Sequence, residues 1–249
     1  MEAFDLSGRV AIVTGGGQGI GEGIAKNLSK AGAAVVVAAR STDRIGRVAS
    51  EINEAGGQAL AVTTDVTDRA AVTALVDAAV EHFGGLHVLV NNAGGSPVRT
   101  PLSEISEDDW DWCLRLNLTA VWMATVIAAE RMTDGGSVIN ISSPAGDRGV
   151  PGSGHYAAAK AGVNSLTKTL SLELAPKIRV NGISPGYVPT EVMMTALDTD
   201  VEQLEAMALK RIPLKRLGTP DDMGTTAVFL ASDAGSWVTG QTIIVAGGN

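Results

Sequence analysis

The sequence predicts an α/β fold in which a doubly wound parallel sheet of about seven strands forms a single domain. Three observations lead to this prediction. Short β-branched runs alternate with longer segments of helical periodicity, a glycine-rich turn follows the first run, and a helical insertion interrupts the alternation near the end. The 249 residues show no linker, repeat or low-complexity tract, so we expect one domain over residues 1–249.

Seven short runs are predicted to be strands, because each is mostly apolar and four to six residues long, as in sheets covered on both faces. In chain order they are Val10–Thr14, Ala34–Ala39, Ala59–Thr63, Leu86–Val90, Ser137–Ile141, Arg179–Ile183 and Thr242–Val245. The segments between them place apolar residues three and four apart, as Ile24, Ala25 and Leu28 do, which indicates helices. Strands that alternate with helices pair in parallel through right-handed crossovers.

Residues 187–213 break this alternation, because they contain no strand pattern but two short helical patterns. The apolar residues of these patterns are Met193, Met194, Leu197, Leu204 and Met207. The segment follows the carboxyl end of a predicted strand, where ligands of such sheets bind, so we expect a mobile apolar lid over a substrate. The alternative is a small helical cap that only completes the core.

Composition and charge exclude several classes of function. The chain has 19 basic and 27 acidic residues and a net charge of −8, which argues against nucleic acid or an anionic membrane as a partner. The longest apolar run, Ala33–Ala39, is too short to span a membrane, and residues 1–5 show no secretion signal, so we expect a cytoplasmic protein. Cys113 is the single cysteine and the three histidines are not spaced as ligands, so no metal site is predicted.

The glycine-rich turn has the sequence Thr14-Gly15-Gly16-Gly17-Gln18-Gly19-Ile20-Gly21. It does not fit the common G-x-G-x-x-G spacing, but the physical requirement is the same. Glycine lets the backbone turn sharply and approach a pyrophosphate at the N-terminus of the following helix. After the first strand of a parallel sheet, this turn predicts a dinucleotide site rather than an ordinary loop. The predicted cofactor contacts are Gly15, Gln18, Gly19, Ile20 and Gly21.

The end of the second strand, Ala38-Ala39-Arg40-Ser41, distinguishes between cofactors. NAD sites carry a carboxylate near this point that binds the ribose 2′-hydroxyl, whereas this chain has Arg40. A guanidinium pairs with a 2′-phosphate and stacks on adenine, so NADP(H) is the preferred cofactor and NAD(H) the alternative. Arg40 and Ser41 are the predicted contacts, while Arg44 either assists or points to water. The competing interpretation of Arg40 is a solvated strand end.

Tyr156 and Lys160 are four residues apart, which places them on one face of a helix. Ser143 lies thirteen residues before Tyr156, just past the end of a predicted strand. The three side chains are therefore predicted to meet at the carboxyl edge of the sheet.

Together these motifs resemble those of the short-chain dehydrogenases/reductases, in their short single-domain branch. The resemblance covers nearly the whole chain. It rests on Thr14-Gly15-x-x-x-Gly19-Ile20-Gly21, Asp65-Val66, Asn91-Asn92-Ala93-Gly94, Asn117, Ser143, Tyr156-x-x-x-Lys160 and Pro185-Gly186. It implies a Rossmann fold, a nicotinamide cofactor and a homotetramer.

The resemblance also implies a role for each catalytic position. Tyr156 is the acid/base that gives a proton to a carbonyl oxygen as hydride arrives, and Lys160 lowers the pKa of Tyr156 and bonds the ribose hydroxyls. Ser143 holds the substrate oxygen, with Ser142 as the neighbouring alternative. Asn117 holds a water that links Lys160 to solvent, or else only bends its helix. Further implied cofactor contacts are Asp65, Val66, Asn91, Ala93, Gly94, Pro185, Gly186, Val188 and Thr190.

Substrate and assembly are predicted from apolar residues. The lid methionines, with Val150, Pro151 and Tyr187, favour a small apolar carbonyl or alcohol as substrate. The stretch Tyr156–Ala175 is apolar or small on almost every face, which suggests a subunit interface and agrees with a homotetramer.

Two alternative functions remain at this stage. A 3-oxoacyl-[acyl-carrier-protein] reductase docks an acidic carrier and needs a basic entrance, but residues 130–136 are basic at one position only. A non-catalytic NAD(P)-binding sensor or scaffold is expected to have lost catalytic positions, all four of which are occupied here.

Overall fold

The computed structural model describes residues 2–248 and contains one seven-stranded parallel sheet of order β3-β2-β1-β4-β5-β6-β7. The strands are β1 (Val10–Thr14), β2 (Ala34–Ala39), β3 (Gln58–Thr63), β4 (Leu86–Asn91), β5 (Met132–Ile141), β6 (Ile178–Pro185) and β7 (Thr242–Val245). The strand order reverses beside β1, where the chain crosses from one half of the sheet to the other. The predicted doubly wound α/β fold is therefore confirmed, and ligands of such sheets bind at this reversal.

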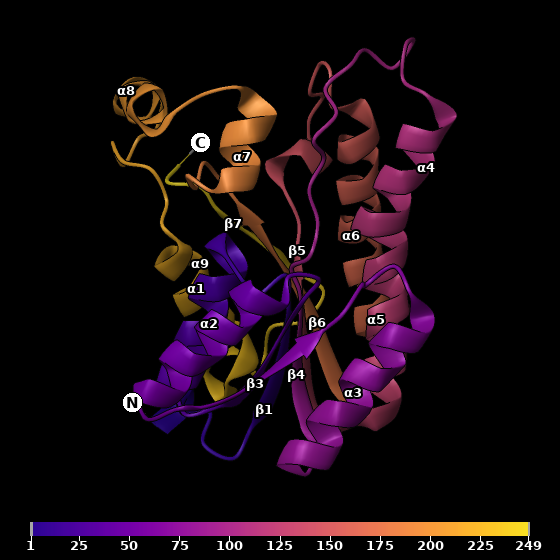
Figure 1. The fold of residues 1–249 in the computed structure, drawn as a ribbon, viewed down its shortest axis with the longest axis vertical. Coiled ribbons are helices and arrows are strands. Elements are labelled where there is room, and N and C mark those ends of the chain that lie inside the picture. The colour runs from indigo at the N-terminus through magenta and orange to yellow at the C-terminus, as the bar shows by residue number, and fades with distance from the viewer. Residues whose placement is uncertain (1, 249) are drawn as a thin grey trace.

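Helices cover both faces of the sheet (Figure 1). One face is covered by α1 (Gly19–Lys30), α2 (Thr42–Glu54) and α9 (Pro220–Ala231). The other is covered by α3 (Arg69–Phe83), α5 (Ala120–Arg131) and α6 (Gly154–Glu173). Successive strand residues face opposite layers: Ala11 and Val13 pack under the first set, while Val10 and Ile12 pack under the second. Because the helices on both sides pack apolar residues against the sheet, the sequence of each strand is a nearly continuous run of apolar residues.

A long helical segment follows β4. It consists of α4 (Glu107–Leu114), a π-helical turn at Arg115–Thr119, and α5. The Ser106 side chain caps α4 by accepting a hydrogen bond from the backbone N–H of Asp109. By length and composition alone the helix Glu107–Arg131 is apolar enough to cross a membrane, but half of its apolar 18-residue stretch is buried inside the fold. It is thus built as a core helix.

Strand β5 differs most from its predicted bounds, because it begins at Met132 rather than Ser137. Met132 pairs with Leu86 of β4, and after a register shift Ser137 pairs with Val88. The glycine pair Gly135-Gly136 gives no strand signal in the sequence, since glycine is depleted in strands. Pairing with the neighbouring strand extends β5 through it.

Glycines let α1 and α9 pack closely. A Cβ on Gly23 would lie 2.4 Å from the Cβ of Pro220, and a Cβ on Gly224 would lie 2.4 Å from Nδ2 of Asn27. Side chains at either glycine would force the helices apart. This contact fixes the position of α1, whose N-terminus follows the glycine-rich turn.

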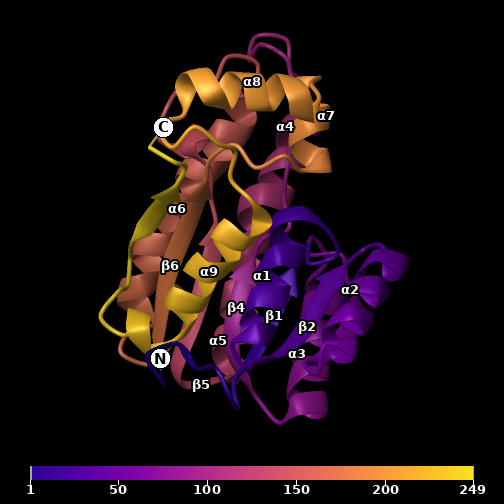
Figure 2. The ribbon, with the colours of Figure 1, turned by 90° about the vertical axis from the view of Figure 1, so that its left-hand side faces the viewer.

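The insertion forms two helices, α7 (Glu191–Leu197) and α8 (Val201–Arg211). Both are capped at their N-termini, by Thr190 and Asp200. Figures 1 and 2 show them at one end of the molecule, beyond the carboxyl ends of the strands. The two helices predicted for residues 187–213 are therefore present and placed over the edge of the sheet that holds the site.

Candidate active site

A cavity of about 630 Å³ opens at the carboxyl edge of the sheet. It brings together most of the residues that the sequence predicts. Those lining it are Gly15, Gln18, Gly19, Ile20, Gly21, Arg40, Ser41, Asp65, Val66, Ala93, Gly94, Ser143, Tyr156, Lys160, Pro185, Gly186 and Thr190. Segments that are distant in the sequence therefore line one cavity, which extends from the end of β2 to the start of α6.

The glycine-rich turn presents the N-terminus of α1 to this cavity. Gly19 is the first residue of the helix and has a φ of +56°, a conformation that favours glycine. The N-cap residue Gln18 makes no side-chain capping bond, so the first-turn N–H groups are left for a ligand. The Gln18 Oε1 atom is also buried without a hydrogen-bond partner among the described residues. The N–H groups at this end of the helix fit an anion such as a pyrophosphate, whereas the Gln18 Oε1 atom, which is an acceptor, fits a donor such as a hydroxyl group.

Asn92 holds the turn in place, a role that sequence reasoning missed. Its Nδ2 donates to the carbonyl oxygens of Thr14 at 2.9 Å and Gly15 at 3.1 Å. Thr14 Oγ1 in turn accepts from the backbone N–H groups of Asn92 and Ala93. The Asn91-Asn92 motif contained the signal, but only the fold shows which asparagine faces the turn.

Asn91 and Val188 lie away from the cavity wall. Asn91 is buried and its Nδ2 donates to Thr125 Oγ1 at 3.0 Å and Asn140 Oδ1 at 2.9 Å, so its side chain ties β4 to α5 and β5. Val188 is fully buried in the core under α1 and α9. Both positions support the cavity from behind.

The adenine end of the cavity, as the resemblance assigns it, carries positive charge. Arg40 is exposed at the end of β2 and lines the cavity. Hydrogen bonds from Thr67 lower the pKa of Asp65, and the nearby charges of Arg40 and Arg115 lower it further. Arg44 donates to Glu191 of α7 at 2.9 Å, a surface ion pair that links α2 to the insertion beside the cavity. Such exposed pairs contribute about 0–1 kcal/mol and open easily.

The end of the cavity opposite Arg40 holds Tyr156, Lys160 and Ser143. Lys160 is buried and its Nζ donates to the carbonyl oxygen of Ile141 at 2.8 Å, while lying 5.6 Å from the centre of the Tyr156 ring. The Ser143 side chain is close enough to the Tyr156 phenol to lower its pKa. Ser142, the alternative serine, instead donates to Asn164 Oδ1. The structure therefore favours Ser143 as the partner of Tyr156.

The pKa of Tyr156 does not follow the expectation from the resemblance. Desolvation by the surrounding protein raises the pKa of Tyr156 to about 12, and the contact with Ser143 only partly offsets this. Burial lowers the pKa of Lys160 to about 8. The cost of burying a phenolate is therefore the largest effect on Tyr156 in the chain alone, and the lowering of its pKa by Lys160 together with a bound nicotinamide stays a prediction. At neutral pH Tyr156 is protonated.

Asn117 is fully buried in the π-helical turn and supports the loop after β4. Its Oδ1 accepts from the backbone N–H of Gly95 at 2.8 Å, and its Nδ2 donates to the carbonyl oxygens of Gly95 and Cys113. A Cβ on Gly94 would lie 2.7 Å from Asn117 Oδ1 and 3.6 Å from Lys160 Nζ. Asn117 and Lys160 therefore both lie close to Gly94, and Asn117 does not line the cavity itself.

The histidines have structural partners. His87 Nδ1 accepts from the backbone N–H of Val10 at 3.0 Å. His155 is fully buried, and its Nε2 forms a 2.8 Å hydrogen bond with Ser96 Oγ. Within residues 2–248, no group of three or more His, Cys, Asp and Glu side chains is placed to hold a metal ion.

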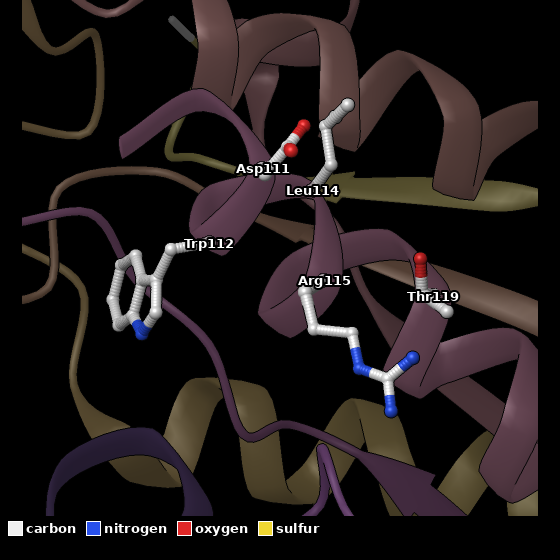
Figure 3. Close-up of a pocket in the computed structure, with 5 residues that line it drawn as sticks. All are labelled: Asp111, Trp112, Leu114, Arg115 and Thr119. Carbon is white, nitrogen blue, oxygen red and sulfur yellow. The ribbon is translucent and has the colours of Figure 1, made fainter. Parts of the chain in front are cut away.

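A second, more open hollow lies on α4 and the π-helical turn (Figure 3). It is lined by Asp111, Trp112, Leu114, Arg115 and Thr119, which project from one continuous helix. None of the predicted site residues is among them. Trp112 lines both hollows, but the acid/base candidates belong only to the larger one.

Comparisons with known proteins agree with this geometry. Residues 15–249 match the family model described as enoyl-(acyl carrier protein) reductase. An uncharacterised oxidoreductase of Methylorubrum extorquens is 44% identical, and the alignment covers 98% of each chain. A cis-4-hydroxycyclohexanecarboxylate dehydrogenase of Sinomonas cyclohexanicum is 40% identical over 99% of this chain and 98% of that one. A solved 7α-hydroxysteroid dehydrogenase, complexed with NADH and 7-oxo glycochenodeoxycholic acid, superposes with a TM-score of 0.93 at 35% identity and covers 100% of this chain and 96% of that one.

Proposed function

Because the chain belongs to the short-chain dehydrogenase/reductase family, a family of oxidoreductases that bind NAD(P)(H), we propose that it interconverts a ketone and a secondary alcohol with NADP(H). The observation that carries this proposal is the single cavity in which the uncapped N-terminus of α1, Arg40, Ser143, Tyr156 and Lys160 all meet. The N-terminus of α1 and Arg40 would bind a dinucleotide that carries a 2′-phosphate. Ser143, Tyr156 and Lys160 would carry out the carbonyl reduction.

The residues present fit a nicotinamide dinucleotide. The N–H groups at the N-terminus of α1 would hold its pyrophosphate, while Arg40 and Ser41 would hold the 2′-phosphate of NADP(H). When bound, the cofactor supplies or accepts the hydride. Pro185, Gly186 and Thr190 also line the cavity, and Thr190 lies against the glycine-rich turn, where a Cβ on Gly19 would be 3.0 Å from its Cγ2.

Tyr156 supplies the proton in this proposal. A pKa of about 12 keeps its phenol protonated at neutral pH, which is the form that gives a proton to a carbonyl oxygen. Ser143 holds the same oxygen and directs it to the phenol. Lys160 offers a positive charge next to the phenolate that forms, and Asn117 keeps the Gly94–Gly95 loop packed against that charge. In the reverse direction, alcohol oxidation, Tyr156 would have to start as the phenolate, because it would then accept the proton of the alcohol.

The lid would cover the substrate. Val192, Met193 and Leu197 of α7 line the cavity and give it a flexible apolar wall, which favours a small carbonyl compound of apolar body. The alternative of a 3-oxoacyl-[acyl-carrier-protein] reductase is supported by the similarity to such a reductase of Thermotoga maritima, which is 37% identical over 98% of each chain. A cytoplasmic homotetramer is the proposed form of the protein.

The test is consumption of NADPH or NADH with a panel of ketones and 3-oxoacyl thioesters. We expect ketone-dependent oxidation of NADPH, with NADH used less well. Preference for the thioesters by several orders of magnitude would replace the ketone proposal with the acyl reductase. Binding of cofactor without turnover of any carbonyl compound would favour a non-catalytic sensor or scaffold.

A further inference from the structure

A charged cluster of four side chains lies behind the glycine-rich turn, where α1 packs beside α2. It consists of Glu22 and Lys26 of α1 and of Arg47 and Glu51 of α2. Lys26 Nζ lies 2.6 Å from Glu22 Oε1 and 2.6 Å from Glu51 Oε2. Arg47 contacts the same two carboxylates. None of the four is among the described residues that line the cavity, and the proposed reaction gives them no role.

The guanidinium of Arg47 is held in one orientation. Its Nη1 donates to Glu22 Oε1 at 3.1 Å and to Glu51 Oε1 at 2.7 Å. Its Nη2 donates to Glu22 Oε2 at 2.7 Å and to the backbone carbonyl oxygen of Gly17 at 3.2 Å. Each of the four N–H bonds on the two Nη atoms therefore has an acceptor. Exposed ion pairs are individually weak, but paired bonds and shared charges in a cluster fix the plane of a guanidinium.

The bond from Arg47 to Gly17 connects this cluster to the cavity. Gly17 belongs to the glycine-rich turn and lines the cavity. Helix α2 packs directly on it, because a Cβ on Gly17 would lie 3.0 Å from the Cβ of Arg44 and 3.3 Å from Cγ2 of Ile45. The turn is thus supported from behind by the first half of α2.

This bond also sets the direction of the next N–H group. The peptide bond between Gly17 and Gln18 is trans. In a planar trans peptide the carbonyl oxygen and the following N–H point in opposite directions. Because the Gly17 oxygen points to Arg47, the N–H of Gln18 points away from it, and Gln18 lines the cavity. That N–H directly precedes those of the first turn of α1.

Glycine makes the opposite orientation of this peptide accessible. With no side chain, Gly17 can adopt backbone conformations that other residues avoid, so the packing of a Cβ does not hold the peptide in place. A reversed peptide would direct its carbonyl oxygen, an acceptor, to where an anion needs a donor. The hydrogen bond from Arg47 is therefore the contact that selects the orientation suited to an anion.

We propose that Arg47 is a positioning residue for the pyrophosphate of the cofactor. It holds the Gly17 carbonyl on the α2 side of the turn, so that the Gln18 N–H joins the donors at the N-terminus of α1. Glu22 and Glu51 in turn hold the guanidinium. This inference rests on the proposed binding of a nicotinamide dinucleotide and adds to it how the turn is kept ready for the anion.

The test measures the dissociation constants of NADPH, NADH and adenosine 2′-monophosphate by calorimetry, without turnover. Arg47→Gln is expected to weaken NADPH and NADH binding by the same factor, roughly tenfold, because a hydrogen bond to a charged group is misaligned in both. Adenosine 2′-monophosphate has no pyrophosphate, so its affinity should change less than about twofold. A role of Arg47 in stability alone would not separate these ligands.

Lys26→Gln is the matched control. It removes one positive charge from the same charged cluster and breaks ion pairs to the same two carboxylates, but it leaves the bond from Arg47 to Gly17 in place. We expect NADPH affinity within about twofold of wild type in this variant. Arg47→Lys should stay weaker than wild type, because an ammonium group lacks the planar fork. If Arg47→Gln does not fold, Arg47→Lys takes its place in the comparison.

The possible outcomes separate this inference from the function it serves. Equal losses of NADPH affinity in Lys26→Gln and Arg47→Gln would mean that only the charge of the cluster matters, and would overturn the positioning role. An equal loss for adenosine 2′-monophosphate and NADPH, or no loss for either, would overturn it as well and leave the reductase standing. A wild-type protein that binds neither nucleotide would overturn both proposals.

Discussion

Lys160 Nζ donates a hydrogen bond to the carbonyl oxygen of Ile141 at 2.8 Å, so the catalytic helix is fixed to the end of β5 by the side chain that also carries the charge of the site. Ile141 is the last residue of that strand, and Ser143 follows it by two positions. This contact, together with the hydrogen bond from Ser142 to Asn164 of the same helix, holds the strand end that bears Ser143 against the helix that bears Tyr156.

Lys160→Gln should lower kcat for ketone reduction by roughly 100-fold or more, because it removes the positive charge beside the phenolate that forms. The glutamine amide can still reach toward the Ile141 carbonyl, so the midpoint of thermal unfolding should fall less than for Lys160→Ala. Steady-state kinetics and calorimetry of the two variants measure these effects. Turnover within a few-fold of wild type in Lys160→Gln would rule out an electrostatic role.

The rate should depend on pH with opposite signs in the two directions. Burial lowers the pKa of Lys160 to about 8, so its charge is present below that pH and is lost above it. Tyr156, with a pKa raised to about 12, stays protonated throughout the neutral range. Ketone reduction should therefore be constant below about pH 7 and decline above pH 8, while alcohol oxidation should rise with pH. Profiles of kcat/KM against pH, for ketone reduction and for alcohol oxidation, measure both effects. A reduction rate that rises through pH 8 would contradict the roles assigned to Lys160 and Tyr156.

Arg40→Asp should weaken NADPH binding by roughly 100-fold, since it replaces the guanidinium at the 2′-phosphate position with a repelling charge. NADH binding should fall only a few-fold or improve, because a carboxylate there accepts the ribose 2′-hydroxyl. Fluorescence titration with both nucleotides gives the ratio. Arg44→Gln serves as comparison, since Arg44 is paired with Glu191. Equal losses for the two nucleotides would mean that Arg40 does not recognise the phosphate.

Gly23→Ala should destabilise the fold by about 1–3 kcal/mol, because the new Cβ would press on Pro220 and move α1 from α9. The matched control is Gly46→Ala in the middle of α2, where a Cβ meets nothing within 4 Å. There alanine should stabilise by about 0.5–1 kcal/mol through helix propensity. Denaturant titration of the two variants decides between these outcomes, and a neutral Gly23→Ala would refute the close-packing argument.

The sequence predicts the sheet well because its strands are apolar on both faces. Six of the seven runs lie within two residues of the observed strand bounds at either end, and β1, β2 and β7 agree at both ends. The start of β5 was not predictable, since its glycine pair adopts strand geometry only through the pairing with β4. Local propensity contains no information about a neighbouring strand.

The site was predictable where residue types and spacing carry the chemistry, as for Tyr156, Lys160 and the glycine-rich turn. Asn92 was missed, since two adjacent asparagines cannot be told apart without the direction of the strand end. The raised pKa of Tyr156 was also beyond the sequence, because desolvation depends on what surrounds the hydroxyl.

The central claim is that Tyr156 supplies the proton in a site that binds its cofactor through other residues. The most direct measurement is a parallel NADPH titration and ketone-reduction assay of wild type and Tyr156→Phe. The account predicts NADPH affinity within about threefold of wild type and a loss of turnover of roughly 1,000-fold or more in the variant. Retained turnover in Tyr156→Phe, with NADPH bound as tightly as before, would contradict it.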